Sequence, residues 1–221
     1  MKKIMFALMG MMMISSTSVF AQLSYGVKAG LNLTTQSIKI DDEKEDDIKF
    51  KPGFNIGAFA DYSLSDLLSV EAGLNIETKG YKSKETEEEF GAKSEIKITS
   101  NIVYLTIPVQ ARLNFGGFYA LVGPYVGIAA TGKMKSEVTV TFGKESETEK
   151  EDEKFEFGND EEESDLKRLD FGLGVGAGYE ITDNFGVRLG YDLGLANLAP
   201  GGGSDYKMKN GSINLSATFK F

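Results

Sequence analysis

The chain contains no cysteine, no histidine and no tryptophan, and only 4 of its 221 residues are proline. Without cysteine it forms no disulfides and offers no thiolate for catalysis or metal binding. Without histidine it has no Ser-His-Asp triad, no imidazole metal ligand and no histidine proton shuttle. Basic residues are the minority, with 24 Lys and Arg against 33 Asp and Glu and a net charge of −9. Because phosphate binding needs a basic surface, this balance argues against a nucleic-acid partner.

Long hydrophobic runs are also missing after the N-terminal segment, so the sequence predicts no membrane-spanning helix. Lys2 and Lys3 precede an apolar run at residues 4–14, and small residues follow up to Ala21. That run is too short to cross the ~30 Å of a bilayer core as a helix. A basic start, a short apolar core and small residues are typical of a secretory signal peptide. We therefore expect residues 1–21 to be cleaved and residues 22–221 to form one domain.

In the rest of the chain, apolar residues recur at every second position, which is the period of a β-strand with two unlike faces. In residues 169–181, for example, apolar side chains alternate with Gly172, Gly174, Gly176 and Gly178. This period of two excludes the glycine-rich turn of a nucleotide site. The same alternation predicts eight strands, at residues 23–33, 54–64, 68–78, 103–115, 118–130, 169–181, 185–195 and 213–221.

The predicted connections alternate between short and long. Short turns lie at residues 65–67, 114–117 and 182–184, and long loops lie near 35–53, 79–102, 131–168 and 196–212. Short turns at one end and long loops at the other are typical of bacterial transmembrane β-barrels. We therefore predict an all-β fold, an eight-stranded antiparallel up-and-down transmembrane β-barrel with short periplasmic turns and long acidic extracellular loops.

The composition of the two strand faces indicates which one meets lipid. The apolar face carries almost no charge, whereas the other face combines glycines with equal numbers of cations and anions. Eight strands enclose a lumen that side chains can fill, and charges in a low-dielectric interior need partners. We expect an ion-paired, closed lumen formed by Lys28, Asp61, Glu71, Glu77, Lys79, Arg112, Arg168, Asp170, Glu180, Arg188, Asp192 and Lys220.

Aromatic residues and acidic residues are expected at opposite ends of the barrel. Aromatic side chains of the apolar face gather near the short turns, as in an interfacial girdle. In addition, Phe221 ends an alternating strand, and a strand that ends in this way resembles the C-terminal signal read by the barrel assembly machinery. Of the 33 acidic residues, 25 lie in the regions 35–53, 83–95 and 133–165 and at Asp205. These regions lack the spacing of a dedicated calcium loop, so we interpret them as solvated charge runs. Within the last region, residues 137–142 alternate and could extend a hairpin above the membrane.

Five segments of the chain share the pattern of a known group of proteins: Gly26–Asn32, Tyr104–Val109, Gly123–Tyr125, Asp170–Tyr179 and Gly194–Asn197. They resemble the Bacteroidetes outer-membrane β-barrel domain proteins, the group that includes PorT-type proteins, and more broadly OmpX- and OmpA-type barrels. The resemblance covers about residues 23–221, and it implies the fold and an outer-membrane location but little about activity. The acidic region 133–165 departs from it, which argues against transferring a secretion role.

These observations predict a non-enzymatic outer-membrane protein with a structural or interaction role. We expect no cofactor, no metal and no catalytic residue, because the lumen carboxylates Glu71 and Glu77 are better explained as ion-pair partners than as an acid/base pair. Expected partners are outer-membrane lipids, the assembly machinery during biogenesis and an unidentified envelope or extracellular protein, with the chain itself a monomer. The alternatives are an accessory component of a secretion or uptake system, a lipid-modifying enzyme, a narrow channel, or a soluble lipocalin-like binder.

Overall fold

The computed structural model describes residues 22–40, 43–44, 48–89, 92–143, 145–160, 162–201 and 206–221. The expected signal peptide at 1–21 lies outside these ranges, as do Asp41, Asp42, residues 45–47, Glu161 and Asp205. In the described part of the chain, no helix is long and apolar enough to cross a membrane.

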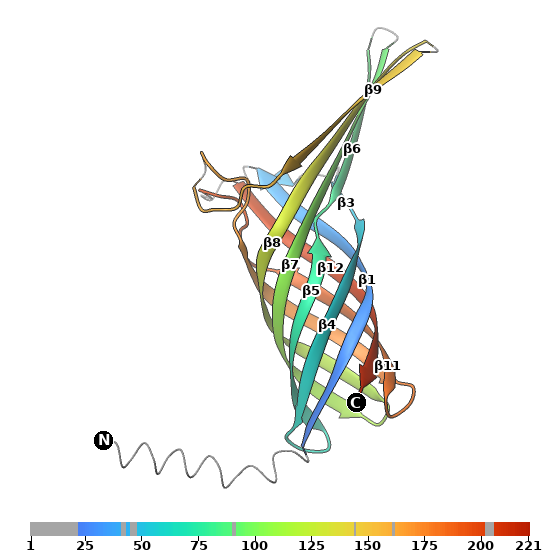
Figure 1. Ribbon diagram of the computed structural model, residues 1–221, viewed down its shortest axis with the longest axis vertical. Helices are drawn as coiled ribbons and strands as arrows, with labels where there is room; N and C mark the ends of the chain where they lie inside the picture. The colour runs from blue at the N-terminus through green and yellow to red at the C-terminus, as the bar shows by residue number, and fades with distance from the viewer. Residues whose placement is uncertain are drawn as a thin grey trace, which may run out of the picture.

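Eight strands form a closed antiparallel ring in chain order, and the ring closes where the first strand pairs with the last, for example at Leu31 and Leu215. All eight predicted strands and the up-and-down order are confirmed (Figure 1). The ring strands are β1 (Leu23–Ile40), β4 (Lys51–Ser63), β5 (Leu68–Lys79), β7 (Ala92–Phe115), β8 (Phe118–Phe142), β10 (Leu169–Glu180), β11 (Phe185–Gly194) and β12 (Tyr206–Lys220). Four more strands stand outside the ring: β2 (Glu43–Lys44), β3 (Ile48–Lys49), β6 (Lys82–Glu89) and β9 (Glu145–Lys154).

The apolar face of each ring strand points outward. Leu31 is 70% exposed and Leu189 56%, whereas their neighbours Asn32 and Arg188, on the opposite face, are 1% and 7% exposed. A soluble lipocalin-like barrel would have the reverse arrangement, with its apolar side chains inside. The belt of exposed apolar side chains therefore excludes the lipocalin-like alternative and fits a barrel surrounded by lipid.

Aromatic side chains surround the short-turn end of the barrel. Tyr25, Phe118 and Phe221 are all more than half exposed, and Tyr25 packs against Phe221 with ring centroids 5.7 Å apart. Phe118 and Tyr179 pair in the same way at 4.5 Å. The backbone N–H of Phe221 donates to the carbonyl of Tyr25 at 3.0 Å, which ties the C-terminus to β1. This arrangement is typical of one interfacial girdle of an outer-membrane barrel.

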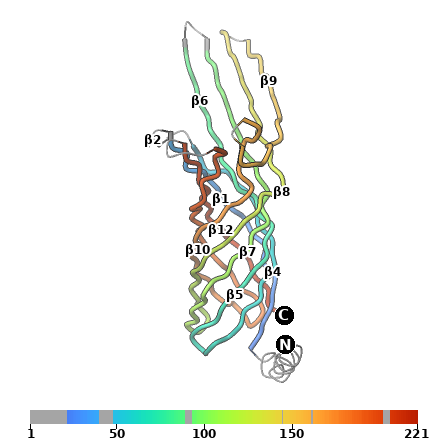
Figure 2. The backbone as a smooth tube through the Cα atoms, turned by 90° about the vertical axis from the view of Figure 1, so that its left-hand side faces the viewer, coloured from blue at the N-terminus to red at the C-terminus, as the bar shows by residue number. Residues whose placement is uncertain are grey.

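At the opposite end, β6 and β9 pair with the upper halves of β7 and β8 to form a four-stranded arm beyond the barrel (Figures 1 and 2). The prediction of irregular loops at 83–95 and across 133–165 was therefore wrong for most of these residues, whereas the hairpin extension at 137–142 is confirmed. Likewise β1 continues to Ile40 and β12 begins at Tyr206, inside regions predicted as loops. The strands β6 and β9 were missed because they are polar on both faces and lack an apolar alternation.

An apolar layer lies inside the barrel at the arm end. Its buried members come from β1, β7, β8 and β12 and from the segments that follow β9 and β11. Leu166 and Leu198 are 3% and 0% exposed although neither lies in a strand, and the N–H of Leu198 bonds to the carbonyl of Met208 at 2.8 Å. The segments between strands therefore fold back over the mouth and close it, which the sequence did not reveal.

Candidate functional site: the barrel lumen

The charges inside the barrel form two clusters separated by a small cavity. Eleven of the twelve residues predicted to fill the lumen lie on the inner face of the ring, drawn from every ring strand except β8. They alternate with outward apolar residues because successive side chains of a strand point to opposite faces.

The lower cluster lies toward the short-turn end and is centred on Glu71 of β5. Arg188 of β11 binds Glu71 in a bidentate manner, with Nη1–Oε1 at 2.6 Å and Nη2–Oε2 at 2.7 Å. Arg112 of β7 lies 3.8 Å from Glu71 and 3.5 Å from Asp61, and it also donates to Glu180. Lys220 donates to the same Glu180 oxygen. Three cations and three anions therefore neutralise one another across the lumen.

Tyr119 separates the two guanidinium groups of this cluster. The Arg112 guanidinium lies 3.8 Å from the centroid of the Tyr119 ring, and Nε of Arg188 donates to the Tyr119 hydroxyl at 3.3 Å. A Cβ at the neighbouring Gly178 would overlap the Tyr119 ring, so a larger residue there would displace that ring. Glycine on the inner face therefore leaves volume for larger side chains of adjacent strands.

The upper cluster consists of Lys79, Asp170 and Glu77, all fully or nearly fully buried. Nζ of Lys79 lies 3.0 Å from Asp170 and 3.4 Å from Glu77, and 4.2 Å from the centroid of the Tyr125 ring. Asn210 donates to Asp170 at 2.9 Å, which adds a neutral hydrogen bond to this carboxylate. The carboxylates are thus held by a cation and by uncharged donors, as buried charges require.

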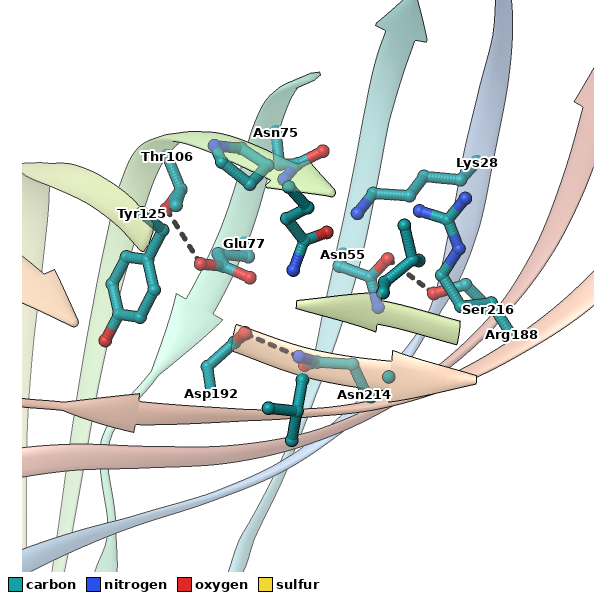
Figure 3. Close-up of a pocket in the computed structure, with 16 residues that line it drawn as sticks. Lys28, Asn55, Asn75, Glu77, Thr106, Tyr125, Arg188, Asp192, Asn214 and Ser216 are labelled. Atoms are coloured by element: carbon teal, nitrogen blue, oxygen red, sulfur yellow. Dashed lines mark hydrogen bonds between the residues drawn. The ribbon is translucent and has the colours of Figure 1, made fainter. Parts of the chain in front are cut away.

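A cavity of about 50 Å³ lies between the clusters (Figure 3). Lys28 and Asp192 line it, and neither has an oppositely charged partner within 4.0 Å among the described residues. Asp192 instead accepts a hydrogen bond from Asn214 at 2.6 Å. The remaining lining is mainly amides and hydroxyls, including Asn55 and Asn75. This volume suits a few hydrogen-bonded waters and is far smaller than a continuous pore.

Two basic residues depart from the sequence prediction. Arg168 is exposed just before β10, where it donates to the carbonyl of Ala129 at 3.2 Å and lies over the ring of Phe157, so it is not a lumen residue. The prediction was wrong because β10 begins at Leu169, so Arg168 lies just outside the strand and does not share its alternation. Conversely, Lys51 was missed: it begins β4, points inward, is 5% exposed, and its Nζ has no hydrogen-bond partner. The sequence offered one signal: Lys51 and Asn55 are an even number of positions apart, so a strand that began at Lys51 would place both side chains on the inner face.

The comparison with known protein families decides the identity of this closed barrel. Residues 19–199 match the family described as outer membrane protein beta-barrel domain. The chain belongs to this family. It is therefore an outer-membrane β-barrel protein.

Solved structures of other small outer-membrane proteins are similar to this outer-membrane barrel. Ail of Yersinia pestis, solved in complex with the heparin analogue sucrose octasulfate, is 16% identical with a TM-score of 0.41 and 90% of this chain and 99% of that chain covered. Neisserial surface protein A (NspA) is 14% identical with a TM-score of 0.36, covering 89% and 97%. OprG of Pseudomonas aeruginosa is 16% identical with a TM-score of 0.32, covering 90% and 95%. No curated protein sequence matches the chain.

The two lumen carboxylates Glu71 and Glu77 are held by internal partners in this outer-membrane barrel. Both oxygens of Glu71 are held by Arg188, and Glu77 accepts from Thr106 at 2.7 Å beside Lys79. A general base needs a free oxygen within reach of a substrate proton; both oxygens of Glu71 are bound by Arg188, whereas the contacts of Glu77 are both made by its Oε1. Among the described residues, no three carboxylates, histidines or cysteines gather in a way that could hold a metal ion.

On the arm, outside the membrane, exposed lysines pair with partly exposed glutamates within and between the strands. Lys84 and Lys97 each lie 2.7 Å from Glu95, and their hydrogen bonds lower the pKa of Glu95 to about 2. Lys150 lies 2.9 Å from Glu137 and lowers the pKa of that carboxyl as well. Exposed pairs of this kind add little stability. They do keep the adjacent strands of the arm electrically complementary.

Proposed function

We propose that this protein is a non-enzymatic outer-membrane barrel with a closed lumen, whose role is interaction through the acidic arm outside the cell. The observation that carries the proposal is the double closure of the barrel. Ion-paired side chains fill the lumen below, and the apolar layer around Leu198 covers it above. Solute transport has no path through such an interior, and Glu71 and Asp170 are held by cations across the lumen.

The arm is the part of the molecule that is built for external contact. β9 contains six carboxylates and two lysines in ten residues, and all ten are exposed. β6 and β9 are the edges of the arm sheet, and charged side chains on such edges discourage pairing with other chains. A partner of this surface would have to be basic or to bring cations, since attraction between exposed groups depends on opposite charge.

The closed lumen is tested by reconstituting the purified barrel in planar lipid bilayers. No conductance steps are expected, while a general porin measured in the same bilayers gives them. Regular conductance steps from the purified protein would contradict the closed lumen.

The external position of the arm is tested with single cysteines, which the natural chain lacks. Glu149→Cys, in β9, should react with a membrane-impermeant maleimide in intact cells. Asp183→Cys, in a short turn at the other end, should react only after the cells are broken. Labelling of Asp183→Cys alone in intact cells would reverse the orientation.

An accessory role in a secretion or uptake system, as in PorT-type proteins, is the alternative function. The broad charged surface of β9 supports it, because such a role needs a stable protein partner. Its test is cross-linking at Glu149→Cys in the producing cells, followed by identification of the adduct. A specific, saturable adduct with an envelope protein favours this alternative over a purely structural role.

We also propose that residues 1–21 direct export and that Phe221 contributes to recognition by the assembly machinery. Phe221 is 67% exposed, so its ring is available to another protein. Phe221→Ala should lower the amount of folded barrel in the outer membrane. Phe115→Ala, another exposed ring at the same end, is the matched control and should leave that amount unchanged.

A further inference from the structure

The two faces of the arm sheet differ in their chemistry. Residues that pair directly across neighbouring strands lie on the same face of a sheet, so the strand register divides the arm residues between two faces. All six ion pairs that the structure describes in the arm, including those of Glu95 and Glu137, join residues of one face. The hydroxyls of Thr139 and Thr148, 3.1 Å apart, lie on that face too. Ion pairing in the described arm is therefore confined to one side of the sheet.

The opposite face, called here the apolar arm face, has an apolar centre and acidic borders. Its centre, on β7 and β8, consists of Ile96, Ile98, Val138, Val140 and Phe142. Glu85 and Glu87 of β6 border it on one side, and the odd-numbered residues of β9 from Glu145 to Glu153, which are all glutamates, border it on the other. Val140 is 47% and Phe142 68% exposed. Among the described residues, these glutamates form no ion pair and no lysine or arginine shares their face.

The apolar arm face continues the inner face of the barrel beyond the mouth. On β7, Tyr104 and Ile102 are fully buried inside the barrel, and Ile98 and Ile96 follow with the same parity. Inside the barrel the opposite wall covers this side of the sheet, whereas the arm strands rise alone beyond the mouth (Figures 1 and 2). A hollow of about 250 Å³ lies on this face, lined by Ile98, Met134, Ser136, Glu151 and Glu153. An exposed apolar face with a polar rim is typical of a protein interaction surface.

Charge and width define the partner of this face. A second copy of the arm would bring the same carboxylates and an anionic lipid surface would bring phosphates, so both are repelled. The two acidic borders lie three strand spacings apart, which is ~14 Å. An α-helix with its side chains is ~10–12 Å wide, so a helix fits between the borders. An extended peptide fits less well, because its successive side chains point to opposite sides and cannot place apolar groups at the centre with cations at both borders.

We propose that the apolar arm face binds a cationic amphipathic helix. The apolar stripe of the helix packs on β7 and β8, and lysines or arginines on both sides of the stripe meet the glutamates of β6 and β9. This inference rests on the interaction role proposed above, and it adds the face of the arm that makes the contact and the chemical class of the partner.

The test is a titration of the folded full-length barrel, in phosphatidylcholine nanodiscs, with a fluorescent peptide of about 18 residues, or five helical turns. The peptide contains only leucine and lysine, with leucine at helical spacing. Neutral lipid is used because anionic lipid would bind the peptide, and empty nanodiscs give the background. Saturable binding above this background is expected, with a gain in helical circular dichroism. No saturable binding, or tighter binding of a peptide of the same composition with strictly alternating leucine and lysine, overturns the proposal.

Two matched double variants separate the apolar arm face from general acidity. Glu147→Gln with Glu151→Gln removes two charges from this face and should weaken binding about three- to tenfold. Glu137→Gln with Asp152→Asn removes two charges from the opposite face and should change the affinity by less than about twofold, because salt screens charges that the peptide does not contact. An equal loss in both variants would mean that the peptide responds only to net charge, and it would overturn the proposal.

A second matched set tests the apolar centre. Val138→Thr with Val140→Thr keeps the β-branched shape of both side chains and should weaken binding about tenfold. Thr139→Val with Thr141→Val, on the opposite face, is the control and should leave the affinity unchanged. An unchanged affinity in the first of these variants contradicts docking on the apolar centre. Because this titration does not depend on lumen closure or membrane orientation, its failure is distinct from a failure of the conductance and labelling experiments.

Discussion

The bidentate pair between Arg188 and Glu71 joins β11 to β5 through the lumen, so breaking it should destabilise the whole barrel. Glu71 is 3% exposed in the natural chain, and in Arg188→Ala its nearest remaining cation among the described partners is Arg112 at 3.8 Å. Removing one partner of a buried pair costs ~3–5 kcal/mol, because the other charge is left uncompensated. We expect the lower figure, about 3 kcal/mol, since Arg188 borders the lumen cavity and its loss admits water to Glu71.

The assay is urea unfolding of the barrel in lipid vesicles, followed by the gel shift of unboiled samples. With a urea dependence of about 2 kcal/mol per molar, the midpoint should fall by about 1.5 M. Glu71→Ala should be comparably damaging, whereas the double variant should cost about 2 kcal/mol less than the sum of the two. Lys135→Ala, which breaks an exposed pair with Asp152 at 3.2 Å, is the control and should change stability by less than about 0.5 kcal/mol. An unchanged midpoint in Arg188→Ala, or strict additivity in the double variant, would refute the ion-paired lumen.

Three further changes probe the mouth, the glycine face and the arm. Leu198→Ala should cost about 2–4 kcal/mol in the same assay because it leaves a cavity in the apolar layer, while the exposed Leu195→Ala should cost less than half of that. Gly178→Val should displace the Tyr119 ring and lower the unfolding midpoint; a midpoint equal to the natural barrel would show that the ring moves freely. The Glu95 pairs contribute above the usual carboxyl pKa of 4.5 and are lost as the pH falls toward the folded-state pKa of about 2. NMR titration of Glu95 should therefore show a midpoint near 2, and a midpoint near 4.5 would disprove the pairing.

The barrel itself was predictable because each ring strand alternates strictly, and a period of two assigns every side chain to one face. Arg188 and Leu189 are adjacent in sequence, yet one lies in the lumen and the other faces outward. Which charges meet was not predictable, since Glu71 and Arg188 lie 117 positions apart and come from non-neighbouring strands. The face on which a side chain lies follows from the local geometry of its strand. The residue that it meets across the lumen depends on the stagger of the strands and on side-chain length.

The errors came from segments where the alternation is weak or ends. β9 reads ESETEKEDEK and has no apolar face, so its strand is specified by pairing with β8 and not by its own pattern. Arg168 has the parity of a lumen residue, but the strand begins one position later. Lys51 was missed because Pro52 and Gly53 resemble a loop, although both continue β4. The apolar layer at the mouth was hidden because Leu166 stands singly among polar residues, and because Leu198 lies in a short apolar stretch, residues 195–200, that lacks the alternation of a strand.

The length of the arm places the carboxylates of β9 at a distance from the barrel mouth. Ten residue pairs join β8 to β9, and at ~3.3 Å per residue they rise about 30 Å past the mouth. The potential of their carboxylates decays over a Debye length of about 8 Å at physiological salt. The carboxylates of β9 therefore act on a charged molecule only close to the arm and not at the membrane surface. If the arm has the interaction role proposed above, a cationic partner would meet it well above the barrel, and the lumen charges would take no part in that contact.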